Sequence, residues 1–359
     1  MKRVLIINTI GFGYEGISSV IINYLKNMDM EGMELVVVVY EKTQKEIRDE
    51  LITYVKIEEL PQRQQNLFGY IRGLFRILKK KNFDVIHIHG NSGTMAIETV
   101  IAKFFRIKKI ITHCHNTTCS HPVLNRFLKK IMMCTSDVHM ACSAAAGKWM
   151  YKKNFVVLNN AIDIEKFAYN EEIRTAYRAA LNISDKFVLG HVGHFTEQKN
   201  HEFLLRTFQK VHEREKNTIL LLLGPKGVLY EDMVTLAEQL KIQDAVMFLG
   251  TRKDIYNFYQ VMDLFVMPSK WEGLPLAMLE AQMSGLNVLV SDVVTEAAKC
   301  THRTIYKSLD EGIEQWSNQI VSIIQNRDER RYDAKQDLIE HGYDIKLEAS
   351  NLKKIYTEE

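Results

Sequence analysis

The sequence DLFVMPSKWEGLPLAMLE, residues 263–280, joins an apolar strand to a helix through a short loop that carries an acid. The run from Asp263 to Ser269 is apolar at its centre, which is typical of a strand buried on both faces of a parallel sheet. Gly273 allows a ligand to approach the backbone closely, and Pro275 suits the first position of the following helix. The stretch therefore predicts one strand–loop–helix step of an α/β fold, with a ligand site at the loop.

Two glutamates flank the start of this predicted helix. Glu272 precedes it, and Glu280 lies one turn further on, on a mostly apolar face. A carboxylate on such a face is unfavourable unless a polar group meets it, for example a sugar hydroxyl. The backbone N–H groups near Gly273 and Leu274 are expected to face outward, towards hydroxyls or an anion. A ligand can bind these carboxylates only if other side chains do not already neutralise them, so internal ion pairs at Glu272 and Glu280 would contradict a ligand role. The alternative is that each is an ordinary, partly exposed glutamate of a helix.

The same alternation of apolar strand and helix runs along the chain and restarts near its middle. The predicted strands are 4–9, 35–40, 84–89, 109–115, 137–143 and 155–159, and then 187–193, 218–224, 246–250, 263–269 and 287–292. The predicted helices include 17–28, 69–80, 93–105, 124–133, 201–213, 230–240 and 274–284. A length of 359 residues also favours two domains. We therefore predict two doubly wound, Rossmann-like α/β domains that face each other across a cleft, residues 1–168 and 169–342.

Composition and cysteine usage are those of a protein from a reducing compartment. No segment approaches the roughly 20 apolar residues that cross a bilayer, and the N-terminal apolar run is too short for a signal peptide. There are five cysteines, an odd number, and four of them fall between 114 and 142. This pattern is poor for disulfides and predicts a cytoplasmic location.

One cluster superficially resembles a zinc site. His113, Cys114 and His115 are followed by Cys119 and His121, but this spacing matches none of the usual zinc patterns. Neighbouring residues on a strand also point to opposite faces. We therefore predict neither a metal nor another cofactor.

Charge is divided unevenly between the two halves. Residues 1–168 carry a net charge of +9 and residues 169–359 a net charge of −6, with basic runs at 72–81, 103–109 and 126–130. These runs are either solvated helix faces or a surface that meets something anionic, such as a phosphate-linked lipid at an acidic membrane. Nucleic acid is not predicted, because the total charge is only +3 and no recognised reading motif is present.

The loop Gly11–Gly16, GFGYEG, matches the G-x-G-x-x-G pattern of dinucleotide sites. It follows a strand and opens a helix, and the second strand ends near an acid, Glu41, so an NAD-dependent dehydrogenase is one hypothesis. However, the first glycine comes two residues after the strand, and Tyr14 and Glu15 occupy positions where a pyrophosphate would lie. A plain turn and a loop for another ligand remain as alternatives.

A second loop of this kind, HVGHFTEQKN, spans residues 191–200 and also leads from a strand into a helix. Lys199 lies at the N-terminus of that helix, where its charge and the helix dipole would attract a diphosphate. The alternative is an ordinary surface lysine.

Together these segments resemble the family-four nucleotide-sugar glycosyltransferases, which have the two-domain GT-B fold, and in particular bacterial enzymes of exopolysaccharide and capsule assembly. The resemblance extends over nearly the whole chain. It rests on GISSVIINYL (16–25), THCHNT (112–117), CSAAAGKWM (142–150), NAIDIEKF (160–167), HVGHFTEQKNHEFL (191–204), FLGTRKDI (248–255) and PSKWEGLPLAMLEAQMSGLNVLVSD (268–292). It also implies that residues 343–359 form a helix that packs back on the first domain.

The resemblance implies roles for the residues of the second half that match the family motifs. Glu272, with the N–H groups of Gly273 and Leu274, would contact hydroxyls of the donor sugar. Glu280 would bind the ribose, and Lys199 would neutralise the departing diphosphate.

Further roles follow for four other residues. His115 would lie beside the donor sugar, and Gly16 would let its loop approach the phosphates. Arg252 would flank the base. His194 stands where the family usually has arginine, and it can still donate a hydrogen bond to a phosphate, although its charge depends on pH. The usual glycine pair of the first loop is Glu15-Gly16 here, and we expect the Glu15 side chain to point towards the acceptor or solvent.

The implied activity is transfer of one sugar from a nucleotide-sugar, with UDP as the expected nucleotide, to a lipid-linked or saccharide acceptor. The family retains the anomeric configuration and needs no metal where cations and N–H groups stabilise the leaving diphosphate. Two other hypotheses stay open at this point: the dehydrogenase, and a non-catalytic sugar-nucleotide-binding protein on the same fold.

Overall fold

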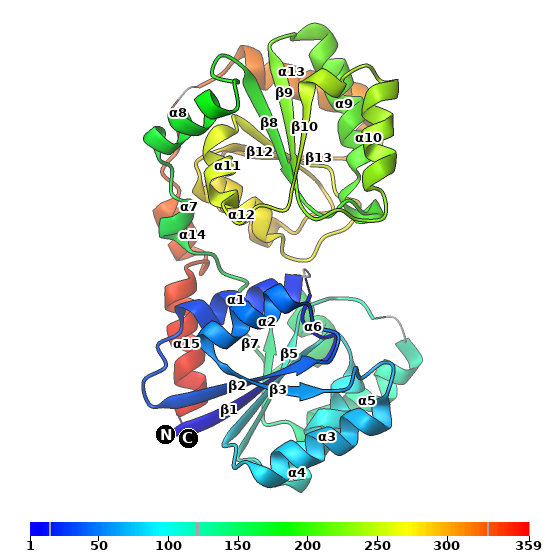
Figure 1. Cartoon of the computed structure of the whole chain (residues 1–359), viewed down its shortest axis with the longest axis vertical. Coiled ribbons are helices and arrows are strands. Elements are labelled where there is room, and N and C mark those ends of the chain that lie inside the picture. The colour runs from blue at the N-terminus through cyan, green and yellow to red at the C-terminus, as the bar shows by residue number, and fades with distance from the viewer. Residues whose placement is uncertain (14–15, 120–121, 329, 359) are drawn as a thin grey trace. The chain divides into compact units, whose positions relative to one another are not determined.

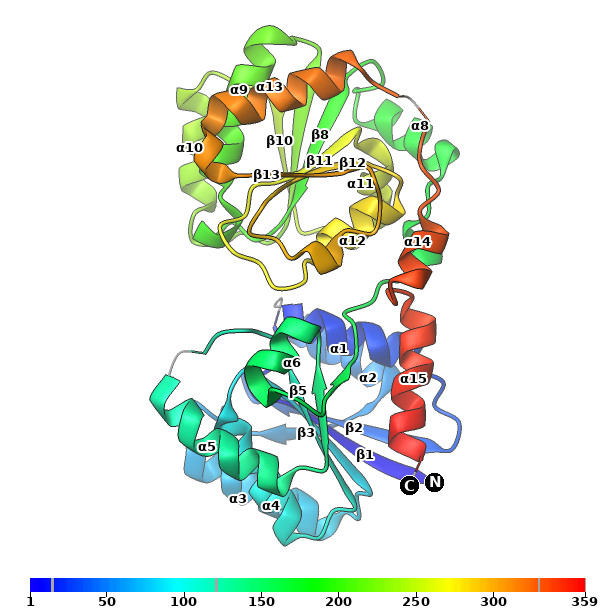
Figure 2. The same cartoon turned by 180° about the vertical axis from the view of Figure 1, so that it is seen from behind.

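The computed structural model describes residues 1–13, 16–119, 122–328 and 330–358, and it divides the chain into two compact units. Unit 1 contains Met1–Ala161 and Ile345–Glu359, and unit 2 contains Ile162–Asp344. Each unit has a parallel sheet with helices on both faces (Figures 1 and 2). The predicted fold class, two Rossmann-like α/β domains, is confirmed.

The sheet of unit 1 has seven parallel strands in the order β3-β2-β1-β4-β5-β6-β7. The strands are β1 (Lys2–Asn8), β2 (Met33–Tyr40), β3 (Lys56–Leu60), β4 (Val85–Gly90), β5 (Lys109–Cys114), β6 (Val138–Ala141) and β7 (Val156–Val157). The helices are α1 (Gly16–Asn27), α2 (Lys45–Tyr54), α3 (Leu67–Lys80), α4 (Ala96–Phe104), α5 (Pro122–Thr135), α6 (Ala144–Tyr151) and α15 (Ile345–Thr357), with a 3-10 turn η1 (Gly93–Met95).

The C-terminal helix α15 is part of unit 1. It packs against α1 and β1, and Lys109 of β5 donates a hydrogen bond to the carbonyl oxygen of Ile355 (2.9 Å). The buried hydroxyl of Tyr356 lies 2.6 Å from Nδ1 of His87 on β4. These contacts cover one face of the unit 1 sheet with the last residues of the chain.

The sheet of unit 2 has six parallel strands in the order β10-β9-β8-β11-β12-β13. The strands are β8 (Phe187–Val192), β9 (Thr218–Leu223), β10 (Val246–Gly250), β11 (Leu264–Met267), β12 (Asn287–Ser291) and β13 (Thr304–Lys307). The helices are α7 (Ile164–Phe167), α8 (Glu171–Ala180), α9 (His201–Arg214), α10 (Tyr230–Gln239), α11 (Ile255–Val261), α12 (Leu276–Met283), α13 (Gly312–Gln325) and α14 (Lys335–Glu340). The 3-10 turns are η2 (Glu197–Lys199), η3 (Gln243–Ala245), η4 (Glu296–Ala298) and η5 (Leu309–Glu311).

The strands of unit 2 divide their side chains between two apolar cores. On β9, Leu220 and Leu222 join the core that α9, α10 and α13 cover, whereas Leu221 and Leu223 join the core that α11 and α12 cover. Successive residues of a strand point to opposite faces, so a strand buried on both sides must be apolar throughout. This is why the continuous apolar runs in the sequence predicted the central strands.

The sequence did not predict two of the strands, β3 and β13. Their sequences are KIEEL and TIYK, and each lies at the edge of its sheet. An edge strand has a partner on one side only and carries charged residues that discourage further pairing. These two strands therefore lack the apolar run of the central strands.

The strand order reverses at one point in each sheet, between β1 and β4 in unit 1 and between β8 and β11 in unit 2. In doubly wound sheets, ligands bind at the carboxyl ends of the strands beside this reversal. In unit 2 the two loops concerned are 193–200, after β8, and 268–275, after β11. Among the described residues, no helix has the length and apolar character needed to cross a membrane.

Candidate active site

The two loops beside the strand reversal of unit 2 are joined to each other by hydrogen bonds. The backbone N–H of Lys270 donates to the carbonyl oxygen of Gln198 (2.8 Å), and the Asn200 side-chain amide donates to the carbonyl oxygen of Pro268 (3.1 Å). Asn200 adopts a left-handed backbone conformation as the cap of α9. The loops after β8 and β11 thus form one continuous surface at the carboxyl ends of the strands.

Lys199 and Glu272 meet on this surface. The ammonium of Lys199 lies 2.6 Å from Oε1 of Glu272, and the side chains are only 16% and 6% exposed. Gln198 donates to the other carboxylate oxygen of Glu272 (3.2 Å) and to the carbonyl oxygen of Trp271 (3.0 Å). The requirement that Glu272 be free of internal ion pairs is therefore not met: Lys199 occupies one carboxylate oxygen of Glu272, and a ligand would have to share or replace that contact. Its partner, Lys199, was predicted to bind the same ligand, but the two residues are 73 positions apart and the sequence did not indicate that they touch.

Gly193 provides the space that the Lys199 side chain occupies. A Cβ atom at Gly193 would lie 2.9 Å from Cγ and 3.0 Å from Cδ of Lys199. Gly224, at the end of β9, has φ +143°, and a Cβ atom there would lie 2.1 Å from the carbonyl oxygen of Gly193. A side chain at either glycine would therefore displace the backbone or the lysine of this loop.

His194 follows Gly193 and is partly buried. Burial, and then the positive charge of Lys199, lower the pKa of His194 below its usual value. The imidazole is consequently neutral at neutral pH, and it cannot supply the permanent charge of the arginine that the family usually has at this position. His194 can therefore contribute a hydrogen bond to a phosphate, but not a positive charge.

Glu280 lies on α12, whose N-cap is Pro275 with φ −78° and ψ 110°. The prediction that Pro275 is the first helical residue was wrong by one position. Tyr259 of α11 donates its hydroxyl to Oε2 of Glu280 (2.7 Å). Burial raises the pKa of Glu280 to about 7, although this hydrogen bond and the charge of Lys166 oppose the shift. The polar group on the apolar face of α12 is thus Tyr259, which no motif in the sequence indicated.

Replacement of Glu280 by glutamine is expected to change how stability depends on pH. A carboxyl with a raised pKa binds more protons in the folded state between pH 4.5 and about 7. The wild-type free energy of unfolding should therefore fall with rising pH through this window, relative to Glu280→Gln, by at most about 3 kcal/mol. Urea unfolding at pH 5 and pH 8 measures the difference. Parallel pH profiles for the two proteins would contradict the assignment.

The other predicted residues of unit 2 make contacts elsewhere. Gly273 is exposed and Leu274 is buried beside Glu272. Arg252 follows β10, forms a two-point hydrogen bond with Asp254 (3.0 and 3.1 Å) and lies over the ring of Phe258. The structure therefore brings Lys199 and Glu272 into contact, whereas Glu280 and Arg252 bond to residues that sequence reasoning had not considered.

The remaining predicted residues lie in unit 1. Gly11 has φ +89°, and a Cβ atom there would lie 2.8 Å from the ring of Tyr40, so this turn requires glycine. Gly16 is the exposed first residue of α1, with open space where a Cβ atom would be. Tyr14 and Glu15, including the predicted direction of the Glu15 side chain, lie outside the described residues.

His115 directly follows β5. Its Nε2 lies 2.9 Å from Nδ1 of His89, and burial lowers its pKa to about 3. The structure also brings ring nitrogens of His87, His89 and His113 within 4.8 Å of one another, on neighbouring strands β4 and β5. Sequence spacing grouped His113 with Cys119 and with His121, which lies outside the described residues, and therefore missed this cluster. The alternate histidines in DVIHIH and THCH were its only signal.

Comparisons with known proteins agree with this architecture. Residues 14–166 match the family model described as Glycosyltransferase Family 4, and residues 173–340 match Glycosyl transferases group 1. The chain is 27% identical to the "Putative glycosyltransferase EpsF" of Bacillus subtilis, over 99% of this chain and 96% of the relative. It is 25% identical to the UDP-Gal:alpha-D-GlcNAc-diphosphoundecaprenol alpha-1,3-galactosyltransferase of Escherichia coli, over 61% of this chain and 60% of that protein. The crystal structure of Anabaena HepE in complex with UDP superposes with a TM-score of 0.82, at 15% identity and full coverage of both chains.

The two doubly wound units and the two family matches define a glycosyltransferase of the GT-B fold class. Within that class, the chain belongs to the family-four glycosyltransferases. The dehydrogenase interpretation of Gly11–Gly16 was therefore wrong. The physical reason is the start of the loop, because β1 ends at Asn8 and Gly11, the first glycine of the pattern, follows only after Thr9 and Ile10, whereas a dinucleotide site has this glycine at the tight turn directly after the strand.

Proposed function

We propose that the protein transfers a sugar from a UDP-sugar to a lipid-linked or saccharide acceptor in surface polysaccharide synthesis, with retention of anomeric configuration and without a metal. The contact between Lys199 and Glu272 beside the strand reversal of unit 2 carries the proposal. Lys199 and Glu272, the residues that we expect to bind the diphosphate and the sugar hydroxyls, are 2.6 Å apart, and a bound donor would share or replace this contact. Unit 2 would bind the donor, and unit 1 the acceptor.

The reaction needs stabilisation of the leaving group more than a strong base. The bond between the anomeric carbon and the diphosphate oxygen breaks, and the acceptor oxygen bonds to that carbon from the same face. The acceptor proton passes to the leaving phosphate. Lys199 would stabilise the charge that develops on the diphosphate, while Glu272 holds Lys199 in position and accepts hydrogen bonds from the sugar. The neutral His194 would donate one hydrogen bond to a phosphate oxygen.

The choice of donor and acceptor rests on the similar proteins. HepE has been crystallised with UDP and with UDP-glucose, and the Escherichia coli relative is named for a UDP-sugar donor and an undecaprenyl-diphosphate-linked acceptor. Another relative is named for O-antigen biosynthesis, and a further one, from Klebsiella pneumoniae, is named for a cps region. A lipid-linked acceptor would be reached at the inner face of the cytoplasmic membrane, and we propose that location.

A thermal-shift panel with UDP, GDP and their sugar conjugates tests the donor. UDP at saturating concentration is expected to raise the Tm by several degrees, because a ligand at 100 times its Kd adds about 2.7 kcal/mol to stability. GDP should give a smaller shift. Slow hydrolysis of the preferred UDP-sugar, unchanged by EDTA, should accompany binding, and NMR of the glycoside formed on an acceptor reports the anomeric configuration. Binding without hydrolysis, and without transfer to any polyprenyl diphosphate-linked sugar, would instead identify a non-catalytic binding protein.

A further inference from the structure

Four histidines lie together on one face of the unit 1 sheet. His87 and His89 are two residues apart on β4, and the same spacing separates His113 on β5 from His115 directly after it. Residues two apart on a strand point to the same face, and the strand register places His89 beside His113. The ring centroids of His87 and His89 are 4.0 Å apart, and those of His89 and His113 are 5.0 Å apart. The fold thus gathers imidazole rings from two strands into one cluster.

Two of these rings have buried nitrogens that lack a hydrogen-bond partner among the described residues. His113 is 1% exposed, and within the described part of the chain neither of its ring nitrogens has a partner. The same is true of Nε2 of His87, which is fully buried. Buried polar groups are normally hydrogen-bonded, so unpaired ones indicate a bound water or ion. Ring nitrogens of His87, His89 and His113 lie within 4.8 Å of one another, so a single ion can reach all three.

The second ring nitrogens of His87 and His89 are already held by other side chains. Nδ1 of His87 lies 2.6 Å from the hydroxyl of Tyr356 on α15, and Nδ1 of His89 lies 2.9 Å from Nε2 of His115. In the tautomer that carries the proton on Nδ1, each Nε2 has a lone pair for a metal. A histidine that binds a metal typically donates its other ring N–H in this way, which fixes the ring and its tautomer. Two rings of the cluster therefore have the outer contacts of a metal site.

A cavity of about 10 Å³ adjoins the cluster. It is lined by His89, His113, Tyr24 and Tyr356, and otherwise by apolar residues, most of them from α1 and α15. A cavity of this size has room for about one water molecule. An ion at the histidines would therefore find space for one water ligand, while the apolar walls keep larger ligands away.

We propose that His87, His89 and His113 bind one Zn²⁺ ion through ring nitrogens, with a water in the cavity as the fourth ligand. Imidazole suits zinc and similar transition ions, whereas magnesium and calcium require oxygen ligands. Three histidines and one water also give the four-coordinate site that is typical of zinc. Zn–N bonds of about 2.0–2.1 Å would bring the nitrogens to about 3.4 Å from one another. Rotation about χ2 can close this gap, because that torsion is broad in histidine.

The ion would have a structural role. It would join β4 to β5 and, through the hydrogen bond between His87 and Tyr356, to the C-terminal helix α15. A water on Zn²⁺ loses its proton near pH 7, which would halve the buried charge. The ligands differ from the cysteine and histidine spacing considered in the sequence, and the ion takes no part in the sugar transfer proposed above.

Metal content and thermal stability test the site without any assay of activity. The full chain, expressed without a histidine tag in medium that contains zinc, should retain one Zn²⁺ per chain after gel filtration, as measured by mass spectrometry of the metal. Protein that is unfolded in EDTA and refolded without metal should have a Tm several degrees lower, because an ion that binds only the folded state stabilises it. Refolding with Zn²⁺ should restore the Tm. Refolding with Co²⁺ should give the intense visible absorption of a tetrahedral site.

Three variants assign the ion to this cluster, with affinity measured by competition with a coloured chelator during refolding. Tyr356→Phe keeps the packing of the ring and removes the hydrogen bond to His87, so zinc affinity should fall by about 10–100-fold. His113→Asn removes a ligand and should lower the affinity further. The matched control is His139→Asn on β6, whose ring is hydrogen-bonded to Ser136 (3.0 Å), and it should retain zinc like the wild type.

The proposal is overturned if the wild-type protein retains no zinc, which would leave a histidine stack that holds water alone. It is also overturned if Tyr356→Phe binds zinc as tightly as the wild type, or if His139→Asn loses as much affinity as Tyr356→Phe. Because Tyr356→Phe leaves all three ligands in place, the test stands even where His113→Asn fails to fold. UDP-sugar hydrolysis tests the transferase proposal separately.

Discussion

Replacement of Glu272 by glutamine, or of Lys199 by methionine, is expected to lower kcat/KM for sugar transfer by about 10²–10³-fold. Each change removes a charged group that would contact the donor, and loss of one preorganised group at a developing charge has an effect of this size. Both changes should also lower the free energy of unfolding, because each leaves the other charge without its partner in a largely buried position. Steady-state kinetics and urea unfolding measure the two effects.

The double variant Lys199→Met/Glu272→Gln separates a catalytic role from a structural one. It removes both charges, so stability should recover towards wild type while activity stays low. Recovery of activity together with stability would show that the pair only holds the two loops together. A matched control is the neighbouring pair Lys270–Glu197 (3.0 Å), which joins the same loops but is exposed to solvent. Glu197→Gln should lower the free energy of unfolding by less than about 1 kcal/mol and leave the transfer activity near that of the wild type.

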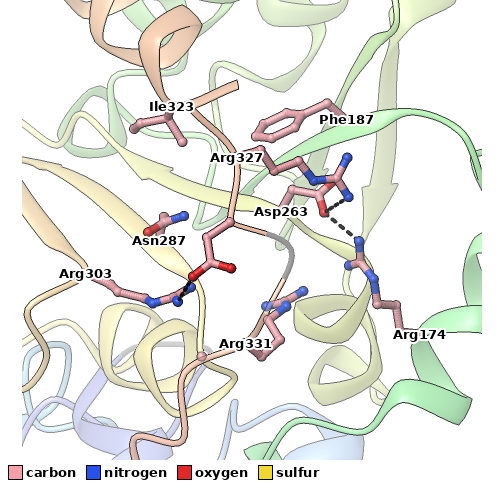
Figure 3. A pocket seen from close by; sticks show the side chains of 10 residues that line it. Arg174, Phe187, Asp263, Asn287, Arg303, Ile323, Arg327 and Arg331 are labelled. Carbon is pink, nitrogen blue, oxygen red and sulfur yellow. Dashed lines mark hydrogen bonds and ion pairs between the residues drawn. The ribbon is translucent and has the colours of Figure 1, made fainter. Parts of the chain in front are cut away.

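Replacement of Asp263 by alanine is expected to destabilise unit 2 by about 3–5 kcal/mol. Asp263 lies just before β11, at the opposite end of the strand from Glu272, and is surrounded by arginines (Figure 3). Its carboxylate pairs with Arg174 (2.5 Å), Arg178 (3.1 Å) and Arg327 (3.4 Å). It also accepts the backbone N–H of Val188 (2.8 Å). Loss of this one anion would leave several guanidinium groups together in a partly buried position.

The pH dependence of this effect has a defined sign. Burial alone would raise the pKa of Asp263, but the charges of Arg174 and Arg178 outweigh it and the pKa lies below the usual 3.8. The stabilisation is therefore present above pH 3.8 and is lost as the pH falls through the lower folded-state pKa. Urea unfolding at pH 7 should show the full difference from Asp263→Ala. As a control, Glu202→Gln breaks a pair with Arg206 on the surface of unit 2, where the two side chains are 58% and 42% exposed, and should lower the free energy of unfolding by less than about 1 kcal/mol. Equal costs for the two variants would contradict the role given to Asp263.

Most of the fold could be predicted because a parallel sheet leaves a strong pattern in the chain. Inner strands such as β2 and β9 are buried on both faces, and their sequences contain the continuous apolar runs LVVVVY and TILLLL. The edge strands β3 and β13 were missed, since their exposed sides tolerate charged residues. Helices α2 and α8 were missed for a related reason: their mean composition is polar, and only a narrow stripe of each meets the core.

The positions of the candidate site residues were largely predictable, but their partners were not. A doubly wound fold brings the loops after β8 and β11 to one edge, so any residues in those loops are neighbours once the alternation is recognised. The alternation and the motifs alone therefore predicted that Lys199 and Glu272 lie in these two loops.

The tertiary structure alone decided which groups touch. The ion pair of Glu272 with Lys199, the hydroxyl of Tyr259 on Glu280, and the meeting of His87 with His113 all join residues from different strands or helices. Side-chain contacts of this kind depend on strand register, helix rotation and rotamer, which are set by packing over the whole unit. The local sequence shows whether apolar residues recur with the spacing of a strand or of a helix, and it shows which chemical groups are present. It does not show the strand register, the helix rotation or the rotamers, which arise only when the whole unit packs.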